Sequence, residues 1–188
     1  MIIVSKYYLE NDRIFLREVR ISDVNEKYYS WLNDPEVNRF LETRFIPQSI
    51  ESIKTYVMEK NSSLNETFFA ICLKDDNKHI GNIKLGPINW IHRKADISLF
   101  IGEKDLWGQS YASEAISIVV KYAFNELGLN KVKAGAYAVN KASIKAFENC
   151  GFKQEGFFIG DVFFDGQEMD SVILGLRVAD YRESSVEK

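Results

Sequence analysis

The chain has 188 residues, which suits one domain with a sizeable hydrophobic core. Its 24 basic and 27 acidic residues give a formal net charge of -3, and this balance argues against a nucleic-acid binder, which needs a clustered basic excess. No run approaches the roughly 20 apolar residues of a membrane span, and the apolar start Met1–Val4 is too short for a signal peptide, so we expect no membrane association and a cytoplasmic protein.

The first half of the chain alternates strand and helix signals. Ile14–Glu18 has the composition of a strand, and Ser22 and Asp23 provide N-cap chemistry for a helix to about Leu32, which Pro35 ends. We then expect a short helical turn over 36–40, a helix after Ser49, a hairpin of strands over 67–73 and 79–85, and a strand over 94–101.

The second half carries the strongest pattern. Apolar residues recur at three-and-four spacing from Ala112 to Leu127, which indicates a long amphipathic helix, and Gly128 suits a left-handed C-cap. We then expect a strand over 131–138, a helix from Asn140 to just before Gly151, and strands over 152–164 and 167–176 joined by an Asp-Gly turn.

The order of these elements predicts the fold class. A single α/β (α+β) domain accommodates it, with an open, mixed, mostly antiparallel central sheet and helices on both faces. We place this domain over residues 1–180 and expect residues 181–188 to form a solvated C-terminal tail.

The loop over 102–112, before the long helix, is the first candidate site. A helix N-terminus presents unpaired backbone N–H groups and a positive dipole end, which suits a phosphate. Taken alone, this loop is equally an ordinary connection between a strand and a helix. Asn140, at the start of the next helix, is likewise explained by N-capping alone.

Two runs at matching spacing resemble motifs of the GNAT superfamily of N-acetyltransferases. Trp-Gly-Gln-Ser-Tyr-Ala-Ser-Glu-Ala, from Trp107, is similar to their coenzyme A pyrophosphate loop, and Asn140–Phe152 is similar to their second conserved helix. Leu16-Arg17 and Trp31–Val37 resemble the branch that holds ribosomal-protein N-terminal (alanine/serine), spermidine and amino-sugar acetyltransferases. Ser110 departs from the family's loop glycine.

The resemblance implies a GNAT fold and acetyl transfer from acetyl-CoA to a primary amine, by direct attack without a covalent enzyme intermediate. It implies a cofactor site made of Leu99, Phe100, Ile101, Trp107, Gly108, Gln109, Ser110, Tyr111, Ala112, Ser113, Asn140, Ser143 and Phe147. We expect no metal site, because Cys72 and Cys150 lack metal-ligand spacing.

The resemblance also implies catalytic roles. A backbone N–H near Phe100 is expected to stabilise the oxyanion. Ser143 is expected to protonate the leaving thiolate, because Phe147 stands where many relatives have a tyrosine; the alternative is a helix-surface serine. Asp161 is the expected base or ammonium anchor, with further candidates at Glu103, His79 and His92.

The acceptor is expected between the N-terminal helices and the last hairpin. The substrate-binding candidates are Trp31, Asn33, Arg39, Phe40, Glu42 and Arg44. Their alternative roles are core packing for the aromatics and a solvated helix face for the arginines. A protein N-terminal α-amine is the first acceptor hypothesis, and an amino sugar (nucleotide sugar), a polyamine or a non-catalytic acyl-CoA sensor are the alternatives. We expect a monomer or a homodimer.

Overall fold

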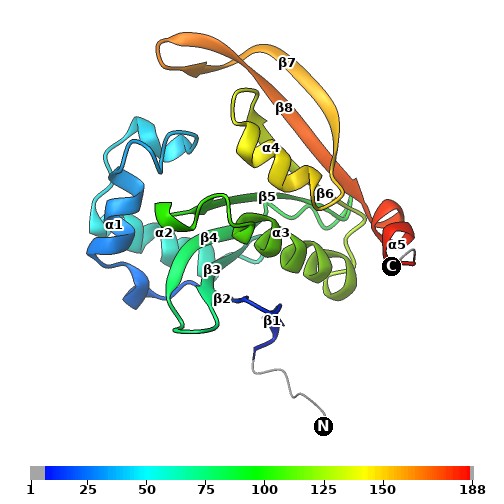
Figure 1. Cartoon of the computed structure of the whole chain (residues 1–188), viewed down its shortest axis with the longest axis horizontal. Helices are drawn as coiled ribbons and strands as arrows, with labels where there is room; N and C mark the ends of the chain where they lie inside the picture. Colours follow the sequence, from blue (N-terminus) through cyan, green and yellow to red (C-terminus); the bar gives the residue numbers. More distant parts are fainter. Residues whose placement is uncertain (1–6, 187–188) are drawn as a thin grey trace.

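The computed structural model describes residues 7–186 of the chain. Within them eight strands form one sheet in the order β1-β2-β3-β4-β5-β6-β8-β7 (Figure 1). The strands are β1 (Leu9–Glu10), β2 (Ile14–Glu18), β3 (Thr67–Leu73), β4 (His79–Leu85), β5 (Lys94–Ile101), β6 (Lys131–Tyr137), β7 (Lys153–Phe164) and β8 (Gln167–Arg177). Neighbouring strands are antiparallel except β5 and β6, which are parallel.

Helices cover both faces of the sheet (Figure 1). They are α1 (Glu26–Asn33), α2 (Ile50–Ser62), α3 (Tyr111–Lys121), α4 (Lys141–Glu148) and α5 (Val178–Val186). A π-helical turn, Tyr122–Glu126, continues α3, and 3-10 turns lie at 21–23, 42–45 and 104–106. Among the described helices, none has the length and apolar character needed to cross a lipid bilayer.

Two apolar layers hold the helices to the sheet. Ile116 and Val119 of α3, both fully buried, pack with the sheet on one face. Tyr28 and Trp31 of α1 and Ile53 of α2 pack on the other face. The amphipathic pattern that predicted the long helix therefore reflects burial against the sheet.

The structure confirms the predicted fold class and most of the element order. The predicted cap of the first helix is wrong. Asn25 caps α1, since its side chain accepts from the N–H groups of Lys27 and Tyr28, whereas Asp23 pairs with Arg17. Residues 36–40 form turns without a helix, and the 3-10 turn follows at Glu42–Phe45.

The C-terminal segment also differs in structure from the expected tail. The helix α5 continues past residue 180, and the ring of Tyr181 packs against Phe124 at 5.3 Å between centroids. The expected boundary at residue 180 therefore falls inside a helix.

The Arg17–Asp23 pair predicts a pH-dependent contribution to stability. Burial raises the pKa of Asp23, but the bonds from Arg17 and from the Arg20 N–H outweigh it, so the pKa lies below its ordinary value. A lowered folded pKa means that the stabilisation is complete above the unfolded value of about 4 and is lost as the pH falls through the folded value.

We predict that Asp23→Asn lowers the free energy of unfolding at pH 7 by about 1–2 kcal/mol. Urea unfolding at pH 7 and pH 3 measures it, and the difference between variant and wild type should shrink at pH 3. An equal difference at both pH values would show that the charge of Asp23 is not the cause.

Candidate active site

The parallel strands β5 and β6 stay together over only part of their length. Their register runs from Lys94 opposite Lys131 to Asp96 opposite Lys133 and then stops. Beyond that point each strand remains paired on its other side, β5 with β4 up to Ile101 and β6 with β8 up to Tyr137. The sheet is therefore open along the last residues of β5.

The ladder decides which backbone groups of β5 face this opening. The Gly86 N–H donates to the Asp96 carbonyl and the Gly102 N–H to the Ile80 carbonyl. Because backbone groups alternate in direction along a strand, those of Phe100 face β4, and those of Leu99 and Ile101 face the opening. The N–H of Phe100 itself, near which the oxyanion donor was expected, therefore faces β4, and the N–H groups on either side of it face the opening.

The backbone conformation of the loop after β5 leaves the first N–H groups of α3 open, as binding of a phosphate would require. Gly108 and Ser110 both have a positive φ, 75° and 69°. Ser110 precedes α3, and among the described residues no acceptor is found for the N–H groups of Tyr111, Ala112 and Ser113. A Cβ added to Gly108 would meet nothing within 4 Å. This N-terminus is therefore open, and it fits a diphosphate.

Arg13, just before β2, holds the loop in place. Its Nη2 donates to the Gln109 carbonyl at 2.7 Å, its Nε donates to the Glu114 carboxylate at 2.8 Å, and its guanidinium lies over the Tyr111 ring. Asn11 donates to the other Glu114 oxygen at 2.9 Å. Because these contacts bind the loop to the sheet from outside, its inner N–H groups keep their direction.

The second motif forms the wall opposite the loop. The Asn140 side chain accepts from the Ser143 N–H at 3.2 Å, so Asn140 is an N-cap in addition to lining the cavity. Ser143 also lines the cavity. Phe147 stands at its edge but is 98% buried, against Phe152, so its ring is mainly a core residue.

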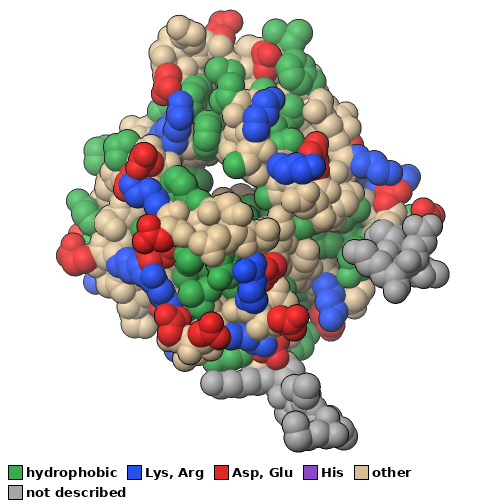
Figure 2. All heavy atoms as spheres, in the orientation of Figure 1, with side chains coloured by type: hydrophobic (Ala, Val, Ile, Leu, Met, Phe, Trp, Pro, Cys, Tyr) green, Lys and Arg blue, Asp and Glu red, His purple; other side chains and the backbone are tan. Residues whose placement is uncertain are grey.

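These elements enclose a cavity of about 1000 Å³. It also reaches the space between the N-terminal helices and the last hairpin, which we call the acceptor side because the acceptor is expected there. Of the expected cofactor residues, all except Gln109 line it. Gln109 turns outward, and its amide donates to the Asp105 carbonyl. The space-filling view shows the surface hollowed through in this part of the molecule (Figure 2).

Carboxylates reach the acceptor side of the cavity from two directions. In β7, the three residues Ile159 to Asp161 lie opposite the single residue Asp170 of β8, which forms a bulge. The bulge contains Asp161, whose carboxylate accepts a hydrogen bond from the Ser171 hydroxyl. From the other side Glu42 accepts from the Tyr137 hydroxyl at 2.6 Å. Asp161 and Glu42 both line the cavity and have acceptor capacity to spare for an ammonium group.

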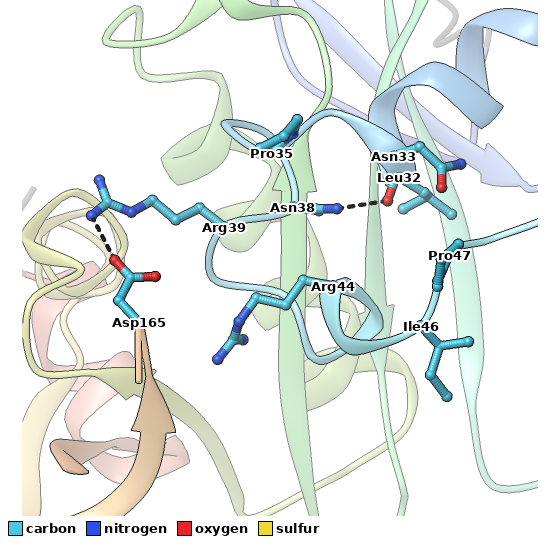
Figure 3. A pocket seen from close by; sticks show the side chains of 9 residues that line it. All are labelled: Leu32, Asn33, Pro35, Asn38, Arg39, Arg44, Ile46, Pro47 and Asp165. Atoms are coloured by element: carbon cyan, nitrogen blue, oxygen red, sulfur yellow. Dashed lines mark hydrogen bonds and ion pairs between the residues drawn. The ribbon is translucent and has the colours of Figure 1, made fainter. Parts of the chain in front are cut away.

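The other expected substrate residues divide between three places. Phe40 lines the large cavity. Trp31 is 96% buried and packs on the backbone of Gly102. It therefore supports the floor of the cavity, by which we mean the ends of β4 and β5, and does not line the cavity itself. Asn33, Arg39 and Arg44 instead line a smaller neighbouring cavity of about 380 Å³ (Figure 3).

The smaller cavity marks where the last hairpin meets the segment after α1. Arg39 points at Asp165 of the hairpin turn, 3.6 Å away (Figure 3). Arg44 donates to the Phe163 carbonyl at 3.0 Å and to the Leu41 carbonyl at 3.1 Å. These contacts close the acceptor side of the cleft.

The alternative bases do not line the cavity. Burial raises the pKa of Glu103, but hydrogen bonds from Lys78 and Lys27 outweigh it and lower that pKa, so this carboxylate is held as an anion. Burial lowers the pKa of His79, which lies beneath the floor. His92 is in an exposed loop.

Sequence reasoning missed Tyr28 and Asn82, which line the acceptor side from α1 and β4. Burial raises the pKa of Tyr28 far above its ordinary value, so its hydroxyl keeps its proton. Asn82 is 99% buried in the middle of a strand otherwise rich in isoleucine. A polar residue inside such a strand is the signal that marked this position.

Comparisons with known proteins agree with this geometry. The family described as "Acetyltransferase (GNAT) domain" matches residues 13–153. The uncharacterized N-acetyltransferase YoaA of Bacillus subtilis is 30% identical over 173 residues, covering 89% of this chain and 95% of that protein. A spermidine N(1)-acetyltransferase of Vibrio cholerae is 31% identical over 91 residues, about half of each chain.

The fold also matches solved structures. The spermidine N-acetyltransferase from Vibrio cholerae in complex with CoA and spermine superposes with a TM-score of 0.82 and covers 92% of this chain and 99% of that one. Its sequence identity is 22%, so this likeness shows the arrangement of the chain.

The loop geometry predicts the effect of Gly108→Ala. A left-handed conformation costs a residue with a side chain roughly 1–2 kcal/mol, so the melting temperature should fall by about 2–8 °C. The new methyl group would project into the open space, so affinity for coenzyme A should fall as well.

Gly166→Ala is the matched control, because Gly166 has a φ of 79° and open space around its added Cβ, at the hairpin turn. It should lose similar stability and keep its affinity in titration calorimetry. Equal affinities in both variants would remove Gly108 from the binding site.

Proposed function

This chain belongs to the GNAT family of acetyltransferases, and on that premise we propose that it transfers the acetyl group of acetyl-CoA to the α-amine of a protein N-terminus. Acetyl transfer from acetyl-CoA is the activity of the family, and the acceptor is the proposal. The observation that carries it is a cleft that joins an open strand edge to a pair of carboxylates without any imidazole between them.

The donor side of the cleft suits acetyl-CoA, which when bound supplies an activated thioester that a neutral amine attacks directly. The N–H groups of Tyr111, Ala112 and Ser113 would hold the diphosphate. The extended arm of acetyl-CoA would lie along the edge of β5 like an added strand. The backbone N–H groups of Leu99 and Ile101 would donate hydrogen bonds to it, and their carbonyl groups would accept them. Asn140 would contact the arm from the side of α4.

Proton handling falls to side chains of the cleft walls. Asp161 and Glu42 would bind the ammonium form of the acceptor, and Asp161 would take its proton directly or through water. The Ser143 hydroxyl holds a proton on the opposite wall, where it would be given to the departing sulfur. Phe147 has no proton to give and is buried.

We propose an α-amine as the acceptor because, among the described residues, no histidine lines the cleft to accept a proton near neutral pH. Neither His79 nor His92 lines it, so no side chain there has an ordinary pKa near neutrality. An α-amine has a reference pKa of about 8, and a lysine-type amine one of about 10.4. The α-amine is therefore the acceptor that needs the least help to become neutral.

Two other acceptors each have one supporting observation. The similarity to a spermidine N(1)-acetyltransferase, which spans 48% of the chain, favours a polyamine. The neighbouring cavity with Arg39 and Arg44 favours an acceptor that carries an anion, such as a nucleotide sugar.

The test of the proposed function is free-thiol release from acetyl-CoA with a panel of peptides, polyamines and amino sugars. We predict turnover with short peptides that have a free N-terminus and none with the same peptides blocked. Tight binding of acetyl-CoA without turnover on any amine would instead identify a non-catalytic sensor.

Ser143→Ala tests the proton donor. We predict a turnover number reduced by about 100-fold or more, with the alkaline limb of the pH profile shifted, because general acid catalysis contributes about 100- to 10,000-fold. The Michaelis constant for acetyl-CoA should change little. Wild-type turnover in this variant would exclude Ser143 from the mechanism.

A further inference from the structure

Asn82 is a buried polar side chain that the fold does not satisfy. It lies in the middle of β4, is 1% exposed, and belongs to the lining of the large cavity. Among the described residues its Nδ2 has no partner at hydrogen-bonding geometry, and its interaction with the Tyr28 hydroxyl only partly offsets the rise that burial causes in the pKa of Tyr28. A buried donor without a partner costs roughly 1–3 kcal/mol, and a ligand that accepts from it removes that cost.

His79 fixes the orientation of this amide. The imidazole Nε2 lies 2.9 Å from the Gly81 carbonyl and 2.8 Å from the Asn82 Oδ1. A carbonyl only accepts, so Nε2 carries the proton and donates to both groups, and the atom of Asn82 that faces it must be the oxygen. The unpaired Nδ2 therefore points away from His79.

The His79 ring is itself locked. It packs edge-on against Trp31 at 5.1 Å and against Tyr28 at 5.8 Å between centroids. Burial lowers its pKa, so it remains a neutral donor to Asn82. The hydrogen bond from His79 therefore fixes the Asn82 amide, and the rings of Trp31 and Tyr28 fix His79. A side chain that recognises a ligand needs such a fixed orientation.

The register places this donor on the acceptor side of the sheet. Asn82 stands opposite Phe100 in the ladder, so both side chains lie on the same face. The Phe100 ring packs with Tyr28 and Trp31 of α1, which cover that face. Asn82 therefore lies between α1 and the sheet, on the face that lines the large cavity, and beside the strand whose far edge faces the opening.

We infer that Asn82 Nδ2 donates a hydrogen bond to an oxygen of the acceptor, so that the substrate is an amine bearing a carbonyl or hydroxyl oxygen close to its nitrogen. This inference rests on the proposed acetyl transfer. A peptide N-terminus offers the first carbonyl, and an amino sugar offers a neighbouring hydroxyl. An aliphatic polyamine is protonated near neutral pH at the nitrogens that do not react, so beside the reacting nitrogen it offers only N–H donors and methylene groups and leaves Nδ2 unpaired.

The cleft is complementary to such an amine as a whole. Glu42 and Asp161 accept, and they suit the ammonium nitrogen. Asn82 donates, and it suits the oxygen. A site built to bond a substrate oxygen discriminates strongly against an analogue that lacks it, because its buried donor is then left unpaired.

Asn82→Asp tests the inference, since an aspartate oxygen still accepts from His79 while the donor becomes an acceptor. We measure kcat/KM by thiol release for alaninamide, glucosamine and 1,4-diaminobutane, and compare wild type with variant for each amine. This ratio cancels the basicity of each amine. Asn82→Ala removes the donor without adding charge and serves as the second variant.

We expect kcat/KM to fall by roughly 10- to 100-fold for an oxygen-bearing amine and to stay within about twofold for the diamine. Alaninamide and glucosamine distinguish a peptide from a sugar as the source of the oxygen. Asn65→Asp is the matched control, because Asn65 is exposed, lies outside the cavity, and keeps its acceptor for the Trp90 indole. It should leave all three rates unchanged.

A common ratio for all three amines, or wild-type rates in both Asn82 variants, would overturn the inference while leaving acetyl transfer intact. If wild type releases no thiol with any amine, the proposed function fails instead. Titration calorimetry of alaninamide and glucosamine into protein saturated with coenzyme A then decides the role of Asn82. Binding that Asn82→Asp abolishes supports the inference, and binding that it leaves unchanged overturns it.

Discussion

The parting of β5 from β6 after three paired positions is the constraint on which the rest of the site depends. Both strands remain hydrogen-bonded on their outer sides, so the opening leaves the sheet intact as two halves. Its consequence is a row of backbone groups, those of Leu99 and Ile101, without strand partners in the centre of the molecule. The helix α3 begins beside the same opening, so in the proposed function adjacent elements would bind the thioester arm and the diphosphate of one ligand.

The acceptor side is assembled from parts that are distant in sequence. The hairpin β7–β8 arches over α4 and brings Asp161 to the cleft (Figure 1). Arg39 and Arg44 fasten its outer end to the segment after α1, which carries Glu42. Beneath them His79 orients Asn82 from within the sheet. In the proposed function, the same contacts would therefore set the geometry of proton transfer and that of acceptor recognition.

Local patterns predicted the elements, because the amphipathic repeat of α3 and the Asp165-Gly166 turn depend on near neighbours in the chain. The motifs likewise identified residues that the structure gathers around one cavity, with the exception of Gln109. The sequence analysis was wrong, or missed a residue, where two local signals compete or where a side chain pairs with a residue far away in the chain. Asp23 has cap chemistry, but Arg17 takes it. Phe100 lines the cavity as a residue, but the hydrogen-bond pattern of the ladder turns its N–H toward β4. Asn82 is marked as a polar residue inside a strand, but its orientation depends on His79 and on a register that no local pattern reveals.

Hydrogen–deuterium exchange of the β5 amides tests the central claim most directly. The amides of Leu99 and Ile101 should exchange readily in the free protein and become protected when coenzyme A is added, whereas that of Phe100 should be protected in both states. Saturating coenzyme A that binds by calorimetry yet leaves Leu99 and Ile101 exchanging at their free rates would contradict the account, since the strand edge would then not hold the ligand.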